Sequence, residues 1–276
     1  MSLVIQGLDV ATPDLKHLAK LSGASAIEAL SPTAFRLREA KPAAGIAEYC
    51  EQARLDFAFV PATRKLSSFR LCVMDMDSTL ITIECIDEIA DLHGLKREVA
   101  AITAAAMRGE LDYSQSLRER VALLKGLDAG ALQRVYDERL RVTPGAQAML
   151  AHMREHRLRT VLVSGGFTFF TERLQRELKL DRAYSNELEI EGDKLTGRVV
   201  GPVFDADAKR AALQRERDEL GIDREQIIAL GDGANDLKFM GEAGVSVAYH
   251  AKPVVRAQAS HAINYVNLDG VLNLFC

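Results

Sequence analysis

The chain has 276 residues, of which 48% are hydrophobic and 27% are charged, and its formal net charge at pH 7 is −4. A chain of this length and composition can bury a full core and has room for more than one domain. The slight acidic excess, together with the lack of any long Lys/Arg block, argues against nucleic acid as a partner.

The start of the sequence and the pattern of cysteines indicate the cellular compartment in which we expect the protein. The stretch MSLVIQGLDVATPDLK has no basic segment ahead of its apolar residues, so we expect neither a signal peptide nor a membrane anchor. The four cysteines, at positions 50, 72, 85 and 276, form no CxxC pair, and Cys72 lies in an apolar run, where thiols usually pack. We therefore expect a cytoplasmic protein with no membrane partner.

Residues 1–64 alternate short apolar runs with helical patterns. Their order is strand, helix, strand, strand, helix, strand, in the segments LVIQGLD, DLKHLAKLSG, SAIEAL, AFRLREA, AAGIAEYCEQARL and DFAFVP. This order is typical of a small ferredoxin-like α+β domain, which we expect to fold as an independent unit. The polar, unpatterned segment ATRKLSSF that follows is the expected linker.

From residue 69 to residue 276, short apolar runs each end abruptly at polar residues or glycines. They are LCVMDMD (71–77), TVLVSGG (160–166), IIALGDGAND (227–236) and VSVAY (245–249). Runs without polar alternation, separated by helical segments, predict parallel strands buried on both faces, as in a doubly wound, Rossmann-like α/β core. Residues 84–142 have helical patterns throughout, which predicts a helical cap over the sheet.

Asp75 and Asp77 close the first of these strands. Ligands of doubly wound sheets bind beyond the carboxyl ends of the strands, so both carboxylates are expected at the site. Side chains two residues apart on an extended segment point the same way, and both can approach one centre unless the turn after Asp75 re-aims the second. Carboxylates at this density suit Mg²⁺ held together with a substrate phosphate. A DxD sequence can also simply cap a strand.

Three further strand ends or helix starts carry groups that phosphoryl transfer requires, and they favour the phosphate site. Ser164 ends its strand with a hydroxyl, and Gly165 beside it lets the backbone come close to an anion. Lys209, at the start of a predicted helix, supplies a fixed positive charge. The glycine-rich turn GDGAND adds the oxygen-bearing side chains of Asp232, Asn235 and Asp236.

The order DxDST, SGG, Lys, GDGAND resembles the signature motifs of the haloacid dehalogenase-like superfamily of aspartate-dependent phosphohydrolases, over residues 69–276. Within it, DMDSTLITIECIDEIA, AMRGELDYSQSLRERVALLKG and GDGANDLKFMGEAGVSVAYHAKP resemble the phosphoserine phosphatase family, of the bacterial two-domain type. The resemblance implies hydrolysis of O-phospho-L-serine to L-serine and phosphate through an aspartyl phosphate, the final step of serine biosynthesis. It also implies Mg²⁺ as the cofactor.

The resemblance further implies roles for individual residues. Asp75 is the expected nucleophile, and Asp77 the expected general acid for the leaving oxygen and then the base for water. The expected ligands of Mg²⁺ are the side chain of Asp75, the carbonyl of Asp77, Asp232 and, in support, Asp236. Ser164 and Lys209 are expected to bind phosphate oxygens, and the backbone N–H groups after Asp75 and of Gly165 are expected to complete this cradle. Asn235 is expected among the substrate-binding residues.

Substrate choice is expected in the helical insertion. By the resemblance, Glu84 recognises the amino group of the substrate and Arg120 its carboxylate, while Met107 and Tyr113 close the pocket. Tyr113 stands where many members of the family have Phe. From composition alone, Glu84 and Arg120 would be solvated helix surface, and Met107 and Tyr113 plain helix packing.

Two other functions stay open at this point. The same scaffold can act on another small phosphate ester or pass phosphate to an alcohol. The chain can also be a non-catalytic amino-acid sensor, although the presence of both Asp75 and Asp77 argues against that. Residues 1–64 resemble the amino-acid-binding ACT fold, which leaves open an amino-acid effector at this unit and a homodimer.

Overall fold

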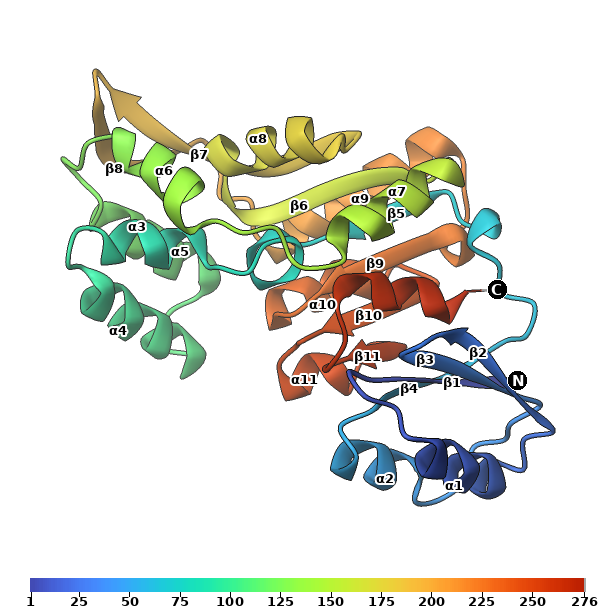
Figure 1. Ribbon diagram of the computed structural model, residues 1–276. Helices are drawn as coiled ribbons and strands as arrows, with labels where there is room; N and C mark the ends of the chain where they lie inside the picture. Colours follow the sequence, from blue (N-terminus) through green and yellow to red (C-terminus); the bar gives the residue numbers. More distant parts are fainter. Residues whose placement is uncertain (276) are drawn as a thin grey trace.

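The computed structural model of the protein describes residues 1–275, and the side chain of Met107 lies outside what it describes. The chain begins with a four-stranded antiparallel sheet in the order β2-β3-β1-β4, covered on one face by two helices (Figure 1). The strands are β1 (Ser2–Gln6), β2 (Ala26–Ser31), β3 (Ala34–Arg38) and β4 (Asp56–Val60). The helices are α1 (Thr12–Ser22) and α2 (Ile46–Gln52). The βαββαβ order predicted from the sequence is confirmed.

The rest of the chain is built on a seven-stranded sheet in the order β11-β10-β9-β5-β6-β7-β8. Its strands are β5 (Leu71–Met74), β6 (Arg159–Phe167), β7 (Arg182–Glu191), β8 (Lys194–Val200), β9 (Ile227–Gly231), β10 (Val245–Tyr249) and β11 (His261–Ile263). All neighbouring strands are parallel except β7 and β8. Its helices are α7 (Ala146–Glu155), α8 (Thr168–Leu178), α9 (Ala206–Leu220), α10 (Leu237–Met240) and α11 (Pro253–Arg256).

The central strand β5 explains why the apolar runs could be recognised in the sequence. Its side chains alternate between two apolar clusters, Cys72 and Met74 on one face and Leu71 and Val73 on the other. Both faces are therefore covered, and every residue of the strand is buried. The doubly wound α/β core is confirmed.

The cap predicted over residues 84–142 is helical. It contains α3 (Cys85–Asp91), α4 (Lys96–Met107), α5 (Tyr113–Ala122), α6 (Gly130–Arg134) and a π-helical turn over Val135–Arg139. The chain leaves the core and returns to it at one place: Thr82 donates its backbone N–H to the carbonyl of Arg141 (3.0 Å), and Thr143 donates to Leu80 (2.9 Å). Figure 1 shows the cap beyond one end of the sheet, on the side opposite the N-terminal unit.

We did not predict the antiparallel hairpin of β7 and β8 from the sequence. The alternation in ELEIEGDKLTGRV, with its central Gly–Asp pair, is a hairpin signal. The hairpin reaches the cap, where Leu195 accepts a backbone hydrogen bond from Gly126 (2.8 Å) and donates one to Leu127 (2.9 Å). Ala129 also donates to the carbonyl of Asp193 (2.8 Å). The cap is therefore attached to the core at a second place.

The N-terminal sheet shares part of its core with the C-terminal segment. Val4, Ala58 and Val60 belong to the same apolar cluster as Val271 and Leu274. Strand β4 lies next to β11, and the ring of Phe69 packs edge-on against that of Phe275, with centroids 5.0 Å apart. One face of their sheet is thus buried by residues from the other end of the chain, which weighs against the independence that we expected for residues 1–64, and that independence stays a prediction. The boundary near residue 64 stays a prediction.

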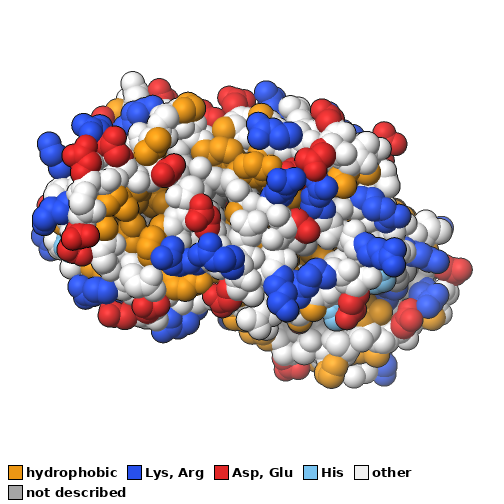
Figure 2. Space-filling view, turned by 90° about the horizontal axis from the view of Figure 1, so that it is seen from above, with side chains coloured by type: hydrophobic (Ala, Val, Ile, Leu, Met, Phe, Trp, Pro, Cys, Tyr) orange, Lys and Arg blue, Asp and Glu red, His pale blue; other side chains and the backbone are white. Residues whose placement is uncertain are grey.

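The surface agrees with the composition. On the face drawn in Figure 2, Lys and Arg side chains are intermixed with Asp and Glu, so this face has no uniformly basic area of the kind that binds nucleic acid. Within residues 1–275, no helix combines the length and apolar character needed to span a bilayer.

Candidate active site

The central side chains of the site lie at the carboxyl ends of three neighbouring strands. Strands β9, β5 and β6 are adjacent and parallel, so their carboxyl ends meet at one edge of the sheet. Asp75 follows β5, Ser164 lies near the end of β6, and Asp232 follows β9. The backbone N–H of Asp75 donates to the carbonyl of Leu230 (3.0 Å), which extends the pairing of β5 and β9 up to the site.

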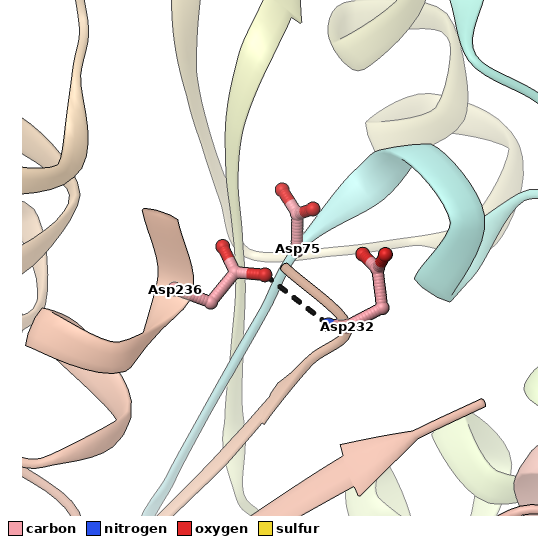
Figure 3. A group of neighbouring side chains, drawn as sticks. All are labelled: Asp75, Asp232 and Asp236. Carbon is pink, nitrogen blue, oxygen red and sulfur yellow. Dashed lines mark hydrogen bonds between the residues drawn. The ribbon is translucent and has the colours of Figure 1, made fainter. Parts of the chain in front are cut away.

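Three carboxylates converge at this edge. Asp75, Asp232 and Asp236 each place an oxygen within 4.8 Å of the others, and Figure 3 shows the three side chains pointing into the same space. Oδ2 of Asp236 accepts hydrogen bonds from the backbone N–H groups of Asp232 (3.2 Å) and Gly233 (3.0 Å). These bonds hold the GDGAND turn in shape, so Asp236 supports the loop as well as facing the cluster.

Lys209 lies among these carboxylates. It projects from α9, is only 1% exposed, and places Nζ 2.5 Å from Oδ1 of Asp75 and 2.8 Å from Oδ1 of Asp236. Burial disfavours the charged ammonium, but the charges of Asp236 and Asp75 outweigh it and raise the pKa of Lys209 above its usual range. Lys209 is therefore a fixed cation at neutral pH.

One ammonium does not balance three carboxylates. Burial and then the charge of Asp236 raise the pKa of Asp75 well above its ordinary value. Burial and the charges of Asp236 and Glu84 raise the pKa of Asp232 to about 7. Two negative charges are left uncompensated when all three carboxylates are ionised, and hard oxygen donors with this charge fit a divalent cation such as Mg²⁺.

Asp77 does not join this cluster with its carboxylate. The chain turns sharply after Asp75, with Ser78 in the left-handed region at φ 56°, and Oδ1 of Asp77 accepts a hydrogen bond from the backbone N–H of Cys85 (3.1 Å). Of the two arrangements that we expected, the structure has the re-aimed one. Burial and the charge of Glu84 raise the pKa of Asp77 to about 7, so its protonated form is well populated at neutral pH.

The SGG segment faces Asp77. Ser164 accepts a hydrogen bond on Oγ from the N–H of Gly166 (2.9 Å), which leaves its own hydroxyl proton free to donate. A Cβ on Gly166 would lie 2.8 Å from Cε of Met76 and 3.0 Å from both Oγ of Ser164 and Oδ2 of Asp77, so a larger residue there would displace these side chains. Asn186, which we did not predict, donates from Nδ2 to the carbonyl of Gly165 (2.9 Å) and holds this backbone in place.

The cap supplies the remaining predicted residues. Oε1 of Glu84 accepts a hydrogen bond from the hydroxyl of Ser78 (2.9 Å), which places it beside the DMDST turn. Arg120 donates from Nε to the carbonyl of Ser116 (3.3 Å), and within residues 1–275 it forms no ion pair with Glu84. The hydroxyl of Tyr113 rests against Gly165, which brings cap and core together. The side chain of Met107 lies outside the described residues.

Asn235 and two residues to which we gave no role complete the GDGAND turn. The side-chain oxygen of Asn235 is folded toward Gly233. Thr79, which is fully buried in the DMDST segment, donates a hydrogen bond from Oγ1 to Oδ1 of Asp232 (3.4 Å). Lys252, in the stretch HAKP, donates its backbone N–H to the carbonyl of Asp232 (3.1 Å). Both lie in segments that were recognisable from the sequence.

Comparisons with known proteins agree with this geometry. Residues 72–241 match the family model for haloacid dehalogenase-like hydrolases, and residues 3–46 match a domain of unknown function (DUF4072). The phosphoserine phosphatase of Polaromonas sp. is 56% identical over 215 residues, which cover 76% of this chain and 91% of that protein.

The chain is also similar to solved structures. The crystal structure of a probable phosphoserine phosphatase from Vibrio cholerae is 36% identical, with a TM-score of 0.86 over 99% of this chain and 85% of that chain. A phospho-aspartyl intermediate analogue of phosphoserine phosphatase is also 36% identical, with a TM-score of 0.71 over 75% of this chain and 99% of that chain. By its strand-end carboxylates and by these matches, the chain belongs to the haloacid dehalogenase-like hydrolases and, within them, to the phosphoserine phosphatase family.

Proposed function

We propose that the protein is a Mg²⁺-dependent phosphatase that hydrolyses O-phospho-L-serine to L-serine and phosphate, the final step of serine biosynthesis. One observation carries the proposal: Asp75, at the end of the central strand, lies in a buried carboxylate cluster beside the fixed ammonium of Lys209. This arrangement presents a nucleophile together with the positive charge that a phosphoryl group needs.

In the first step, an oxygen of Asp75 attacks phosphorus and the bond from phosphorus to the serine oxygen breaks. The product is an aspartyl phosphate, and one difficult displacement is thereby divided into two easier ones. Lys209 stays charged throughout and offsets the negative charge that the phosphoryl oxygens carry.

Asp77 moves the protons. Its pKa of about 7 allows it to donate a proton to the leaving serine oxygen. The resulting carboxylate then takes a proton from the water that attacks the aspartyl phosphate. Phosphate leaves, Asp75 is restored as a carboxylate and Asp77 is protonated again.

The carboxylate cluster is the site that we propose for Mg²⁺. The side chains of Asp75 and Asp232 and the carbonyl of Asp77 would hold the ion, with Asp236 in support. When bound, Mg²⁺ supplies positive charge to the phosphoryl oxygens and balances the uncompensated carboxylates.

We assign substrate binding to two groups of residues. The phosphoryl oxygens would be bound by Ser164, Gly165, Lys209 and Asn235, which line the core side. Glu84 would bind the ammonium group of phosphoserine and Arg120 its carboxylate, since the charges are opposite and both residues lie in the cap segment. Met107 and Tyr113 would close the pocket.

Phosphate release from a panel of phosphorylated amino acids and sugar phosphates, with and without Mg²⁺, tests the proposal. We expect release from phosphoserine to exceed that from the other esters and to require the metal. A preference for another ester, or transfer of phosphate to an added alcohol, would assign the chain to a different reaction on the same scaffold. No release from any ester would favour the amino-acid sensor.

An amino-acid effector of the N-terminal unit is a second part of the proposal. A cleft of about 590 Å³ lies between α2 and β4 on one side and α11 and β11 on the other. Glu51 lines one wall and Arg256 the other, so the cleft offers one charge of each sign to a zwitterion. Calorimetric titration with L-serine tests this: Glu51→Gln should lose one binding event, and Arg120→Ala, which removes product binding at the active site, should keep it.

We also propose a homodimer, because β2 is an unpaired edge of the N-terminal sheet and its Ile27 is 43% exposed. Light scattering of the wild type and of Ile27→Lys tests it. A monomeric wild type at all concentrations would contradict the dimer.

A further inference from the structure

We propose that the hydroxyl of Tyr113 is a ligand of the transferring phosphoryl group, donated by the cap rather than by the core. This inference rests on the proposed phosphatase function. It gives the Tyr113 hydroxyl a role of its own, because closing the pocket by packing needs only the ring.

Tyr113 is held in place at the start of α5. It is the first residue of α5, directly after the N-cap Asp112. Oδ1 of Asp112 accepts from the N–H of Gln115 (2.8 Å), and Oε1 of Gln115 accepts from the N–H of Asp112 (3.1 Å), so the start of the helix is doubly capped. The ring is half-buried against the main apolar cluster. The hydroxyl at its tip therefore has little freedom.

That hydroxyl lies over the phosphate side of the site. A Cβ on Gly165 would collide with it, and the carbonyl of Gly165 is held by Asn186, so neither partner in this contact can easily move away. Gly165 adjoins Ser164, whose hydroxyl proton is free to donate. The two hydroxyl groups, one from the cap and one from the core, thus approach the same part of the site.

The hydroxyl faces the site as a hydrogen-bond donor. Burial raises the pKa of Tyr113 to about 12, so the group keeps its proton at any pH at which the enzyme works. Lys209, Arg120, Asp75 and Asp77 are the charged groups that act on it. Within residues 1–275 the hydroxyl has no protein hydrogen-bond partner at the usual distances, so its proton is available to an anionic ligand at the phosphate site.

The phosphoryl group is a better acceptor for it than the substrate carboxylate. Tyr113 and Arg120 are seven residues apart on α5, which places them on one face of the helix but about two turns apart, roughly 10 Å along its axis. Arg120 serves the carboxylate in the proposed function. The contact of Tyr113 with Gly165 puts its hydroxyl at the other end of the substrate, beside the phosphate ligands.

The consequence is that the phosphoryl group is bound from both sides when the cap is closed. Because one ligand comes from the cap, a bound phosphoryl group favours the closed cap, and closure excludes water before transfer begins.

Tyr113→Phe tests the inference, since it keeps the ring and removes only the hydroxyl. We expect kcat/KM to fall by the same factor, roughly tenfold to a hundredfold, for phosphoserine and for p-nitrophenyl phosphate, which has no carboxylate. The dissociation constant of orthovanadate, measured by calorimetry, should rise by a similar factor, with an unchanged melting temperature. The matched control is Tyr136→Phe, because the Tyr136 hydroxyl donates to Glu177 (2.6 Å) at the cap edge and not in the site.

Three results would overturn the inference. Equal kinetics and equal vanadate binding in wild type and Tyr113→Phe would show that the hydroxyl touches no ligand. A loss confined to phosphoserine would assign it to the carboxylate. A comparable loss in Tyr136→Phe would show a general effect on the cap. If the wild type released phosphate from neither ester, the proposed function would fail, while vanadate binding would still decide the role of the hydroxyl.

Discussion

Asp56 and Tyr265 are joined across the two sheets by a hydrogen bond of 2.9 Å, which runs from the backbone N–H of Tyr265 to Oδ2 of Asp56. The same carboxylate accepts from the N–H groups of Asn264 (2.6 Å) and Val266 (3.2 Å). Asp56 is only 2% exposed. An N-terminal side chain therefore satisfies three consecutive backbone donors of the C-terminal segment.

Replacing this carboxylate should destabilise the whole chain. We expect Asp56→Ala to lower the free energy of unfolding by at least about 2 kcal/mol, because three backbone N–H groups lose their hydrogen bonds to a charged carboxylate. Urea denaturation measures this, with the exposed Asp9→Ala as the control. A variant as stable as the wild type would restore the view that residues 1–64 fold independently.

Asp75→Asn should abolish turnover while the protein stays folded. The amide is a poor nucleophile toward phosphorus, and the change also removes a carboxylate from the metal cluster. Phosphate release from phosphoserine and circular dichroism together check this, with Asp137→Asn on the exposed cap surface as the control. Activity within about tenfold of the wild type would exclude Asp75 as the nucleophile, given the usual weight of a covalent step.

Asp77→Asn should slow turnover by roughly 10²-fold or more, the usual weight of general acid catalysis. It should also change the pH profile. With its pKa at about 7, Asp77 is protonated below that pH, so kcat/KM of the wild type should fall as pH rises through 7. An amide does not titrate, and this fall should be missing in the variant. If the descending limb persists, another group is the acid.

Arg120→Ala should lower kcat/KM for phosphoserine. The fall should correspond to a loss of about 2–5 kcal/mol in transition-state stabilisation, the range for truncating one partner of a buried charge pair. p-Nitrophenyl phosphate, which has neither an amino group nor a carboxylate, should be nearly unaffected. Glu84→Ala should show the same contrast through the ammonium group. Equal losses on the two esters would mean that these side chains position the cap instead of recognising phosphoserine.

Mg²⁺ should stabilise the protein more at high pH than at low pH. The folded pKa of Asp232, about 7, lies above its ordinary value, so without metal the free energy of unfolding falls as pH rises from about 4 to about 7. Mg²⁺ binds the ionised carboxylate, and its stabilising effect should grow over the same window. Calorimetric melting with and without Mg²⁺ at pH values near 5 and near 8 checks this. Asp232→Asn should reduce the difference, and a shift that does not depend on pH would contradict the assignment.

The strand ends of the site could be predicted from the sequence for a physical reason. Strands buried on both faces, such as β5, are almost continuously apolar, so the residue at which each run stops is visible, as at Asp75 and Asp232. The parallel arrangement then brings these ends together. The residue types at these ends suit phosphate and a divalent cation, and from them we predicted the kind of site.

Other features depend on contacts that no local pattern reveals. Asp56 and Tyr265 are 209 residues apart, and Asp56 looks like any polar residue at the start of a strand. The direction of the Asp77 side chain depends on the left-handed conformation of Ser78, and a serine in the sequence does not predict that conformation. Asn186 acts on Gly165 only because β6 and β7 are neighbours, and the hairpin that contains β7 was the element that we missed.

The two attachments of the cap limit how it can move. It meets the core where Thr82 and Thr143 pair with Arg141 and Leu80, and again where the β7–β8 hairpin binds the loop after α5. A rigid body held at two separate places keeps a single rotational degree of freedom, about the line that joins them. Tyr113 lies against Gly165 in the arrangement that these attachments hold, so a cap turning as one body about that line would carry the Tyr113 hydroxyl along a single arc.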